Sequence, residues 1–216
     1  MSDFYIMKYE ASAKSNVSNP PTSATPVSVK GNIPWAQISQ NEAIQVCRDA
    51  GYSLPSNKQW QAATMAEIGN ASTQPLGNTN SGSDANGNSG TPDPTQNGRV
   101  LTGTGPSSWA NPIGVYDLNG NVWEWTSTVV DQSHPMHKGG SDGNVASWNN
   151  NGYPETLGSA NSSLGSDYYW SSSNDNRAVR RGGDWNGGAG VGVFSMSLGN
   201  APSDSGTDFG FRCSLS

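Results

Sequence analysis

Gly-Val-Tyr-Asp-Leu-Asn-Gly-Asn-Val-Trp-Glu-Trp-Thr-Ser occupies residues 114–127 and carries the strongest structural signal in the chain. Apolar and aromatic residues flank the Asn119-Gly120 pair. Asn-Gly is the most favoured two-residue turn between antiparallel strands, because both positions tolerate positive φ. The stretch 113–130 therefore predicts a strand, a turn and a second strand.

A helix is predicted upstream of this stretch. Ser39 and Glu42 have the spacing of a capping box, in which each side chain bonds a backbone amide of the first turn. Ile44 and Cys47 then share one face, and Gly51 supplies the C-terminal stop. Cys47 on such a face is expected to be a core residue.

A second helix is predicted directly after the first. Ser56 and Gln59 repeat the capping spacing, and Trp60, Ala63 and Ala66 share a face. Two consecutive helices with the same capping device are a local signal that needs no knowledge of the rest of the fold.

The remaining chain predicts little regular structure. Residues 4–10 are aromatic and favour a strand, and the Ser/Asn/Pro-rich stretch that follows favours a loop to about residue 33. Residues 69–112 and 131–177 are expected to be irregular, and residues 178–216 to hold short strands. The pattern predicts one α+β domain over residues 1–216, with two short helices, small antiparallel sheets and much irregular loop.

Composition excludes several functions. Hydrophobic residues make up 32% and charged residues 13%, yet eight Trp are present, which indicates a small aromatic core. A net charge of −6 argues against nucleic acid as a partner. No apolar run is long enough to span a bilayer, so we expect no membrane insertion, and the first residues do not have the pattern of a signal peptide.

Metal-ligating residues are few. The chain has two Cys, and its two His, His134 and His137, lie together in one Pro/Gly-rich loop. A composite metal site would need both pairs to meet, so we expect solvated loop histidines instead.

The segment from Val191 to Gly199 alternates in character. Phe194, Met196 and Leu198 fall on one face of an expected strand, and small residues fall on the other. In 203–208 acidic and small residues again recur at every second position. One interpretation is a strand with a buried face and a face free to vary; the other is a Gly-rich sheet edge and turn.

Four ordered motifs place the chain near a known family. They are Gly-Tyr-Ser-Leu-Pro-Ser-Asn-Lys-Gln-Trp-Gln-Ala-Ala at 51–63, the 114–127 stretch, Arg-Gly-Gly-Asp-Trp at 181–185 and Gly-Phe-Arg-Cys at 210–213. In this order they resemble the formylglycine-generating (sulfatase-modifying) enzymes. The resemblance implies a variant of the C-type lectin fold over nearly the whole chain.

The chain departs from those enzymes at the catalytic centre. The enzymes carry a pair of copper-binding cysteines between the Gly-Gly motif and the Gly-Phe-Arg-Cys end, whereas residues 184–209 contain no cysteine. No soft ligand remains there for copper. We therefore expect no copper and no catalysis; the alternative is a sulfur-oxidising or formylglycine-generating enzyme of the same fold.

A second resemblance concerns the C-terminal segment. Trp185-Asn186, Gly192-Val193-Phe194, Asn200-Ala201-Pro202 and Phe209–Arg212 look like the framework of variable proteins from diversity-generating retroelements. The resemblance implies a binding surface within about 184–209, diversified at selected positions, for a protein or glycan ligand such as a host-cell surface receptor. It favours a virion or a cell surface as the location.

The expected ligand-binding positions combine this resemblance with the alternation. They are Asp184, Trp185, Gly187, Gly190, Val191, Ser195, Ser197, Gly199, Asp204, Gly206 and Asp208. Trp185 is the expected aromatic anchor, since aromatic side chains dominate interface energies.

The first resemblance also implies a calcium site and a disulfide. Matching positions in the family hold a structural Ca²⁺ through two side chains and two backbone carbonyls, here Asp117, Gly120, Val122 and Glu124. Alternatively, Asp117 caps a turn and Glu124 pairs with an arginine. Arg180 and Arg181 are expected to pair with Glu124 or another buried carboxylate. Cys47 and Cys213 match a disulfide pair of the enzymes.

Overall fold

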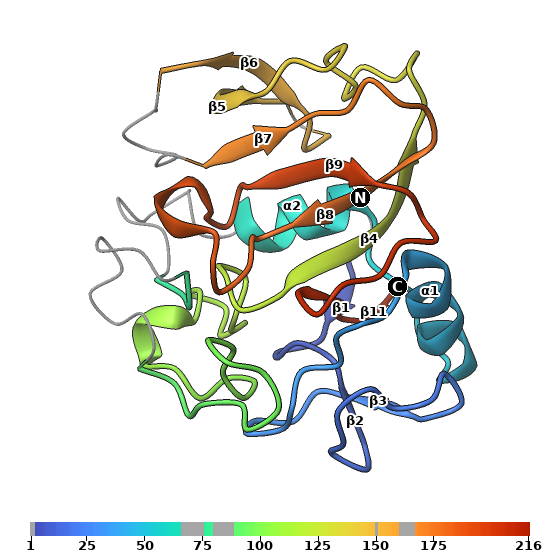
Figure 1. Ribbon diagram of the computed structural model, residues 1–216, viewed down its shortest axis with the longest axis vertical. Helices are drawn as coiled ribbons and strands as arrows, with labels where there is room; N and C mark the ends of the chain where they lie inside the picture. The colour runs from blue at the N-terminus through green and yellow to red at the C-terminus, as the bar shows by residue number, and fades with distance from the viewer. Residues whose placement is uncertain (1–2, 66–75, 80–88, 150, 160–166) are drawn as a thin grey trace.

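A mixed β-sheet runs through the centre of the computed structural model, which describes residues 3–65, 76–79, 89–149, 151–159 and 167–216 (Figure 1). Its strands within these residues are β4 (Trp123–Val130), β5 (Gly143–Trp148), β6 (Pro154–Gly158), β7 (Tyr168–Trp170), β8 (Arg177–Arg181), β9 (Met196–Asn200) and β10 (Phe209–Gly210). The strand order is β10-β4-β8-β9-β7-β5-β6. The pairs β10–β4 and β7–β9 are parallel and the others antiparallel. Small antiparallel sheets alone were expected, so this larger mixed sheet is an addition to the predicted α+β class.

Two small antiparallel sheets bring the ends of the chain together. β1 (Tyr5–Ile6) pairs with β11 (Ser214–Leu215), and β2 (Ser12–Ala13) pairs with β3 (Pro26–Val27). The strand expected over 4–10 is shorter than predicted. Beyond β1 the chain stays bonded to the C-terminal segment, since the Met7 amide donates to the Cys213 carbonyl at 2.9 Å.

Both predicted helices are present. α1 (Gln40–Asp49) begins at the Ser39–Glu42 capping box, and Gly51 follows it at φ +82°. α2 (Asn57–Met65) begins after Ser56, whose hydroxyl and amide bond Gln59. Trp60 and Ala63 are buried, while Ala66 lies outside the described residues.

The hairpin predicted over 113–130 is wrong in its first half. The second strand is β4, but 113–118 is not a strand. Backbone groups in and next to this segment bond to distant parts of the chain. Arg212 Nη2 donates to the carbonyls of Tyr116 and Asp117, at 2.9 and 3.3 Å, and the Gly120 amide donates to the Gly182 carbonyl. β4 therefore pairs with β8 and β10 instead of with its own upstream segment.

The irregular prediction for 131–177 is also wrong, because β5, β6 and β7 lie there. Their apolar residues build a cluster of their own, in which Val145 and Tyr169 pack with Met196 and Leu198 of β9. In the 69–112 segment the described parts, 76–79 and 89–112, do hold only isolated bridges and a short 3-10 helix at Ser107–Trp109.

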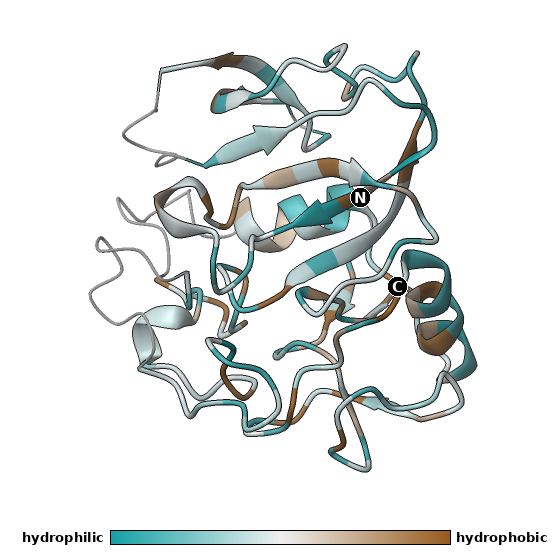
Figure 2. Ribbon diagram, viewed as in Figure 1, coloured by the Kyte–Doolittle hydropathy of each residue, from teal (hydrophilic) through white to brown (hydrophobic). Residues whose placement is uncertain are grey.

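Both faces of the central sheet are buried over most of β4, β8 and β9. Trp125, Arg180, Ser197 and Trp170 lie in one row across β4, β8, β9 and β7. This row faces a hydrophobic cluster that includes Val46 of α1 and Ile38 just before that helix. In Figure 2 the apolar residues of α1 are brown among teal polar ones. The next row, Arg181, Met196 and Tyr169, faces the opposite side. There Met196 and Tyr169 belong to the β5–β7 cluster.

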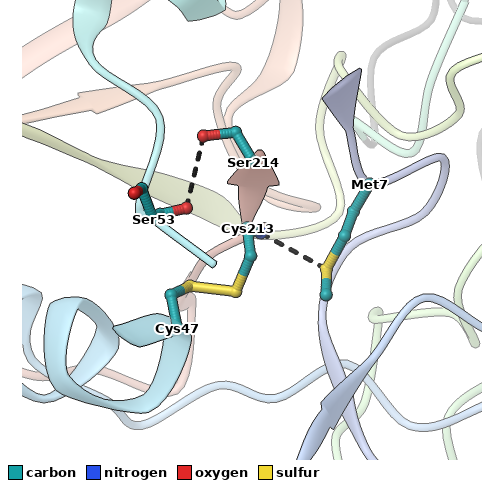
Figure 3. Close-up of a disulfide and its surroundings, with 5 residues drawn as sticks. All are labelled: Met7, Cys47, Ser53, Cys213 and Ser214. Carbon is teal, nitrogen blue, oxygen red and sulfur yellow. Dashed lines mark hydrogen bonds between the residues drawn. A yellow bond between two sulfur atoms is a disulfide. The ribbon is translucent and has the colours of Figure 1, made fainter. Parts of the chain in front are cut away.

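The expected disulfide is present. Cys47 of α1 is bonded to Cys213, next to β11, and both are buried (Figure 3). Met7 of the N-terminal segment lies beside the bond, with its sulfur accepting from the Cys213 amide at 3.3 Å. The bond ties the helix to the C-terminal end of the chain.

Candidate functional site

Two loops frame the C-terminal segment that the sequence singled out. The 182–195 loop joins β8 to β9, and the 201–208 loop joins β9 to β10. Because Asn200 pairs with Ala178 and Phe209 with Trp123, the 201–208 loop starts at one end of the sheet and finishes at the other. It therefore crosses the sheet and ends beside the start of the 182–195 loop.

The loops meet at two aspartates. Asp184 is partly exposed, and its Oδ1 accepts from the Asn186 amide at 2.7 Å. Burial is the main cause that raises the pKa of Asp184, and the adjacent carboxylate of Asp208 raises it further. Like charges placed side by side disfavour double ionisation. This contact makes one acidic patch of the two loops.

Arg180 lies beneath this acidic patch and is 6% exposed. Its Nη2 donates to Ser197 Oγ at 3.2 Å and to Asn200 Oδ1 at 2.6 Å, and its guanidinium lies 3.7 Å from the centre of the Phe209 ring. Burial lowers its pKa to about 10, and the aspartates of the two loops act in the opposite direction. Arg180 therefore remains a cation at neutral pH, and its charge attracts the carboxylates of the patch.

Asp204 holds the start of the 201–208 loop. Its Oδ2 accepts from Asn200 Nδ2 at 3.1 Å and from the Ala201 amide at 3.0 Å. These hydrogen bonds lower the pKa of Asp204, because they favour its charged form. Asp204 is thus a partly exposed carboxylate with a defined orientation.

Trp185 is held from the opposite side. Its amide donates to the Asn121 carbonyl at 3.1 Å, and its ring lies against Gly98. Asn121 is fully buried and belongs to the Gly-Asn-Val-Trp-Glu-Trp motif. A framework motif thus anchors the first aromatic residue of the segment, which is partly exposed.

Eight of the eleven expected ligand-binding positions are exposed or partly exposed. They are Asp184, Trp185, Gly187, Gly190, Gly199, Asp204, Gly206 and Asp208. All of them lie in the two loops or at the end of β9.

The expectation that Ser195, Ser197 and Val191 face solvent is wrong, since they are 0%, 4% and 8% exposed. Ser195 Oγ accepts from the Gly192 amide at 2.7 Å and closes the loop, while Ser197 Oγ accepts from Arg180. The alternation predicted correctly which residues of β9 share a face, but both faces are buried. The polar residues Ser195 and Ser197 therefore stabilise the fold through internal hydrogen bonds.

The 203–208 stretch is a loop and not a strand. Its most exposed residues are Ser203, Ser205 and Thr207, which lie between the expected positions. Asn186 and Ala189 are exposed as well. Sequence reasoning missed these residues because it assumed a strand period in which only every second residue is free.

An aromatic group next to the acidic patch was also missed. Trp123 of β4 packs edge-to-face on Trp170 of β7, with centroids 5.4 Å apart, and Tyr168 packs on Trp170 at 4.9 Å. A hydrogen bond from Trp123 to Asp184 lowers the pKa of that carboxyl. Tyr168 and Trp170 are partly exposed and extend the surface toward β7.

The residues expected to bind calcium do not fit a calcium ion. Both carboxylate oxygens of Glu124 bond Arg212, at 2.6 Å to Nε and 2.5 Å to Nη2, so a guanidinium already neutralises this group. Asp117 Oδ2 accepts from the Gly103 amide at 2.6 Å, and the Val122 amide donates to Glu10. Among the described residues, no group of three or more His, Cys, Asp or Glu is arranged to hold a metal.

The alternative in which Glu124 pairs with an arginine is therefore the observed one, but its partner is Arg212. The expected pairing of Glu124 with Arg180 or Arg181 is wrong, although the charge of another buried carboxylate, Asp167, acts on Arg181. Arg181 donates to Asn57 Oδ1 and Gln61 Oε1 of α2, both at 2.8 Å. Its role is to fasten the helix to the sheet.

Two helices packed with a mixed sheet, long loops at the C-terminal segment and the α1-to-C-terminus disulfide define a C-type-lectin-like domain. The chain belongs to the sulfatase-modifying factor enzyme 1-like domain family, whose model matches residues 2–216.

Solved structures with a similar fold include variable proteins. The M1 variant of the Major Tropism Determinant is 16% identical over 98% of this chain, with a TM-score of 0.51, and the chain spans only 50% of its length. Treponema denticola variable protein 1 is 18% identical over 84% of this chain and 70% of its own, with a TM-score of 0.50. PvdO from Pseudomonas aeruginosa is 19% identical over 98% and 80%, with a TM-score of 0.51. At these identities the likeness concerns the fold. No curated protein matches the sequence.

Proposed function

We propose that the chain is a non-catalytic ligand-binding domain that recognises a receptor through residues 184–190 and 199–208, and that a retroelement diversifies this segment. The observation that carries the proposal is the contrast between these residues and 191–198. All of the former are exposed or partly exposed, while the latter are buried and lock the loops to the sheet. Polar positions borne on loops of a rigid scaffold are the usual carriers of recognition.

The names of two proteins with a similar fold support the proposal. One is a tropism determinant and another is a variable protein. The sequence resembles the framework of that class at Trp185-Asn186 and from Phe209 to Arg212. The chain spans about half of the tropism determinant, so the activity of that whole protein comes to this chain only as part of the proposal.

The chain lacks the free thiolates that the enzymatic alternative would need to bind copper. Copper-dependent oxidation needs soft thiolate ligands, and the chain has two cysteines, which are bonded to each other and buried. The acidic patch offers carboxylates above one buried arginine, an arrangement suited to orienting a bound partner. We expect no oxidation of a Cys-containing peptide supplied with copper and oxygen.

The partner class is a protein or glycan exposed on a host-cell surface. Partly exposed aspartates and a net charge of −6 disfavour nucleic acid. Within the described part of the chain, no helix has the length and apolar character to cross a bilayer. A virion or a cell surface is the location that fits receptor recognition.

The proposal can be tested by selection. A display library would randomise Asp184, Gly190, Gly199 and Asp208, and would be selected against a panel of unrelated purified proteins and an immobilised glycan array. We expect binders of about micromolar affinity or better that differ only at these positions. Their melting temperatures should stay within about 5 °C of the parent, since surface substitutions usually change stability by less than about 0.5 kcal/mol each.

A matched library at Val191, Gly192, Val193, Ser195 and Ser197 serves as the control, because these positions lie in the same segment but are buried. We expect few folded members and no binders from it. If the first library gave no binders, or if both libraries gave folded binders equally often, the proposed surface would be wrong.

A further inference from the structure

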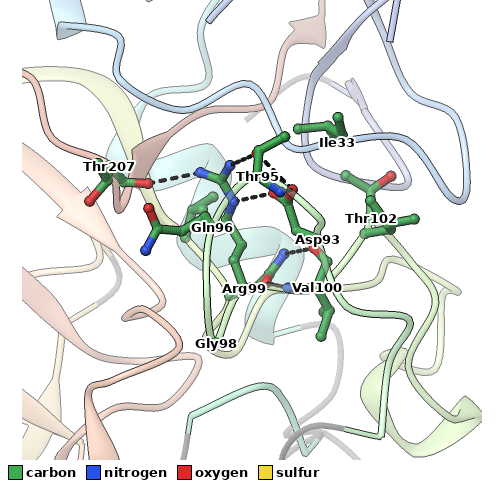
Figure 4. A network of polar contacts seen from close by, with 12 residues as sticks. Ile33, Asp93, Thr95, Gln96, Gly98, Arg99, Val100, Thr102 and Thr207 are labelled. Carbon is green, nitrogen blue, oxygen red and sulfur yellow. Dashed lines mark hydrogen bonds and ion pairs between the residues drawn. The ribbon is translucent and has the colours of Figure 1, made fainter. Parts of the chain in front are cut away.

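We propose that the turn formed by residues 93–99 is a positioning clamp that holds both loops of the ligand-binding surface in place (Figure 4). This role rests on the function proposed above, and it belongs to a segment that was predicted only as irregular. The clamp makes contacts at the two ends of the surface, through Arg99 and through Gly98.

Arg99 holds the end of the 201–208 loop. Its Nη1 donates to the Thr207 carbonyl at 2.9 Å, although the two residues are 108 positions apart. Figure 4 shows the guanidinium extended between Thr207 on one side and Asp93 with Thr95 on the other. A planar guanidinium spreads five donors over three nitrogens in a rigid fork, whereas the three donors of a lysine share one nitrogen. The loop residue next to Asp208 is therefore fixed by a side chain from outside the segment.

The clamp itself is rigid. Arg99 Nε pairs with Asp93 Oδ2 at 2.7 Å, and the two side chains are 4% and 0% exposed. The other oxygen of Asp93 accepts from the Thr95 amide at 2.8 Å and from its hydroxyl at 2.7 Å. Both oxygens of the carboxylate are thus satisfied, so the turn can hold Arg99 in one orientation.

Gly98 holds the start of the 182–195 loop. It has φ +88°, and an added Cβ would lie 2.5 Å from Cδ1 of Trp185, so the backbone of the turn is in close contact with the indole. The Gly98 carbonyl accepts from Asn78 Nδ2 at 2.8 Å, which ties the contact to the interior. A glycine is required here both for the positive φ and for the approach of the ring.

One turn of seven residues therefore touches the first aromatic residue of the surface and the carbonyl just before Asp208. None of its residues is among the expected ligand-binding positions. Holding the loops in advance lowers the cost of ordering them when a partner binds. Arg99 and Gly98 are positioning residues, and their loss should weaken binding without removing any ligand contact.

Each of two variants weakens one contact of the clamp, and the rate of amide hydrogen–deuterium exchange is measured in the loop at each end. Arg99→Lys keeps a cation near Asp93 but loses the fork to Thr207, so we expect exchange in 201–209 to become at least about tenfold faster, with 182–190 unchanged. Gly98→Ala keeps the ion pair but displaces Trp185, so the acceleration should appear in 182–190 instead. Arg48→Lys on the exposed side of α1 is the control and should change neither loop.

A binding readout completes the test. The probe is a single-domain antibody selected on the wild-type protein and mapped to the surface by loss of binding to Asp208→Ala. We expect Arg99→Lys to weaken its affinity about tenfold, because a smaller fraction of molecules presents the competent loop. Unchanged loop exchange and affinity in both variants, or exchange that rises equally in β5 and β6, would overturn the clamp. Neither result depends on the natural ligand, so the selection experiment judges the proposed function separately.

Discussion

Glu124 and Arg212 form a buried ion pair at the place where the family resemblance implied calcium. Both belong to motifs that identified the fold, and the charges of two further buried carboxylates, Glu10 and Asp117, also act on Arg212. A motif records which residues are present but not which of them neutralises the others. The carboxylate that would have faced calcium faces a guanidinium here.

Calcium should therefore leave the stability of the protein unchanged. A ligand that binds only the folded state raises the free energy of unfolding by an amount that grows with the logarithm of the ratio of its concentration to its Kd. Because the expected ligand residues are already paired with protein groups, we expect the melting temperatures measured in excess Ca²⁺ and in excess EGTA to agree within about 1 °C. A rise of several degrees with Ca²⁺ that Mg²⁺ does not reproduce would show that a calcium site exists.

Asp117 should make stability depend on pH. Burial raises its pKa from the ordinary 3.8 to about 6, although the Gly103 amide, Arg212 and Lys30 act against burial, and Glu10 and Glu124 lie in the same cluster. A raised folded-state pKa gives stability that is present below about 4 and is lost as the pH rises through about 6.

The contribution of Asp117 is at most about 3 kcal/mol, since each pH unit of difference is worth about 1.4 kcal/mol. Chemical denaturation of wild type and Asp117→Asn between pH 4 and pH 7.5 measures it. We expect the wild type to lose more stability than the variant over this range. Parallel curves for the two proteins would show that Asp117 does not titrate there.

At the scale of elements, the disulfide joins α1 to the C-terminal segment across a sequence separation of 166 residues. Cross-links that close long loops restrict the unfolded chain most, and a loop of this size is worth about 3–5 kcal/mol. We expect Cys47→Ser/Cys213→Ser to lower the free energy of unfolding by this amount in urea. Reduction of the wild type under denaturing conditions should reproduce the loss, and a variant as stable as the wild type would contradict it.

Elements with local signals were predictable from the sequence, and those defined by distant partners were not. The capping boxes at Ser39 and Ser56 located both helices, because capping depends on residues three positions apart. The Asn119-Gly120 pair suggested a hairpin, yet Arg212 and Gly182 compete for the backbone of that segment. β5 to β7 escaped prediction because they are short and depend on distant partners: β7 pairs with β9, and β5 pairs with β6 and β7.

At the scale of the whole molecule, the ligand-binding surface depends on how the sheet is covered. The resemblance and the alternation together identified eight positions that are at least partly exposed, but the alternation placed Ser195 and Ser197 wrongly. A period of two distinguishes two faces of a strand, but it does not say which face meets water. On one face of β9 the Ser197 hydroxyl is buried against Arg180, and on the other face Met196 and Leu198 pack into the β5–β7 cluster. Freedom to vary therefore belongs to the loops and not to β9.

A stability scan of every substitution at residues 184–208, by protease resistance of displayed variants, tests this division most directly. We predict that most substitutions at Asp184, Asn186, Gly199, Ser203, Ser205 and Asp208 change the free energy of unfolding by less than about 0.5 kcal/mol. Substitutions at Val193, Ser195, Met196 and Ser197 should cost about 1–3 kcal/mol or more. Equal tolerance in the two groups, or greater tolerance in the second, would contradict the account.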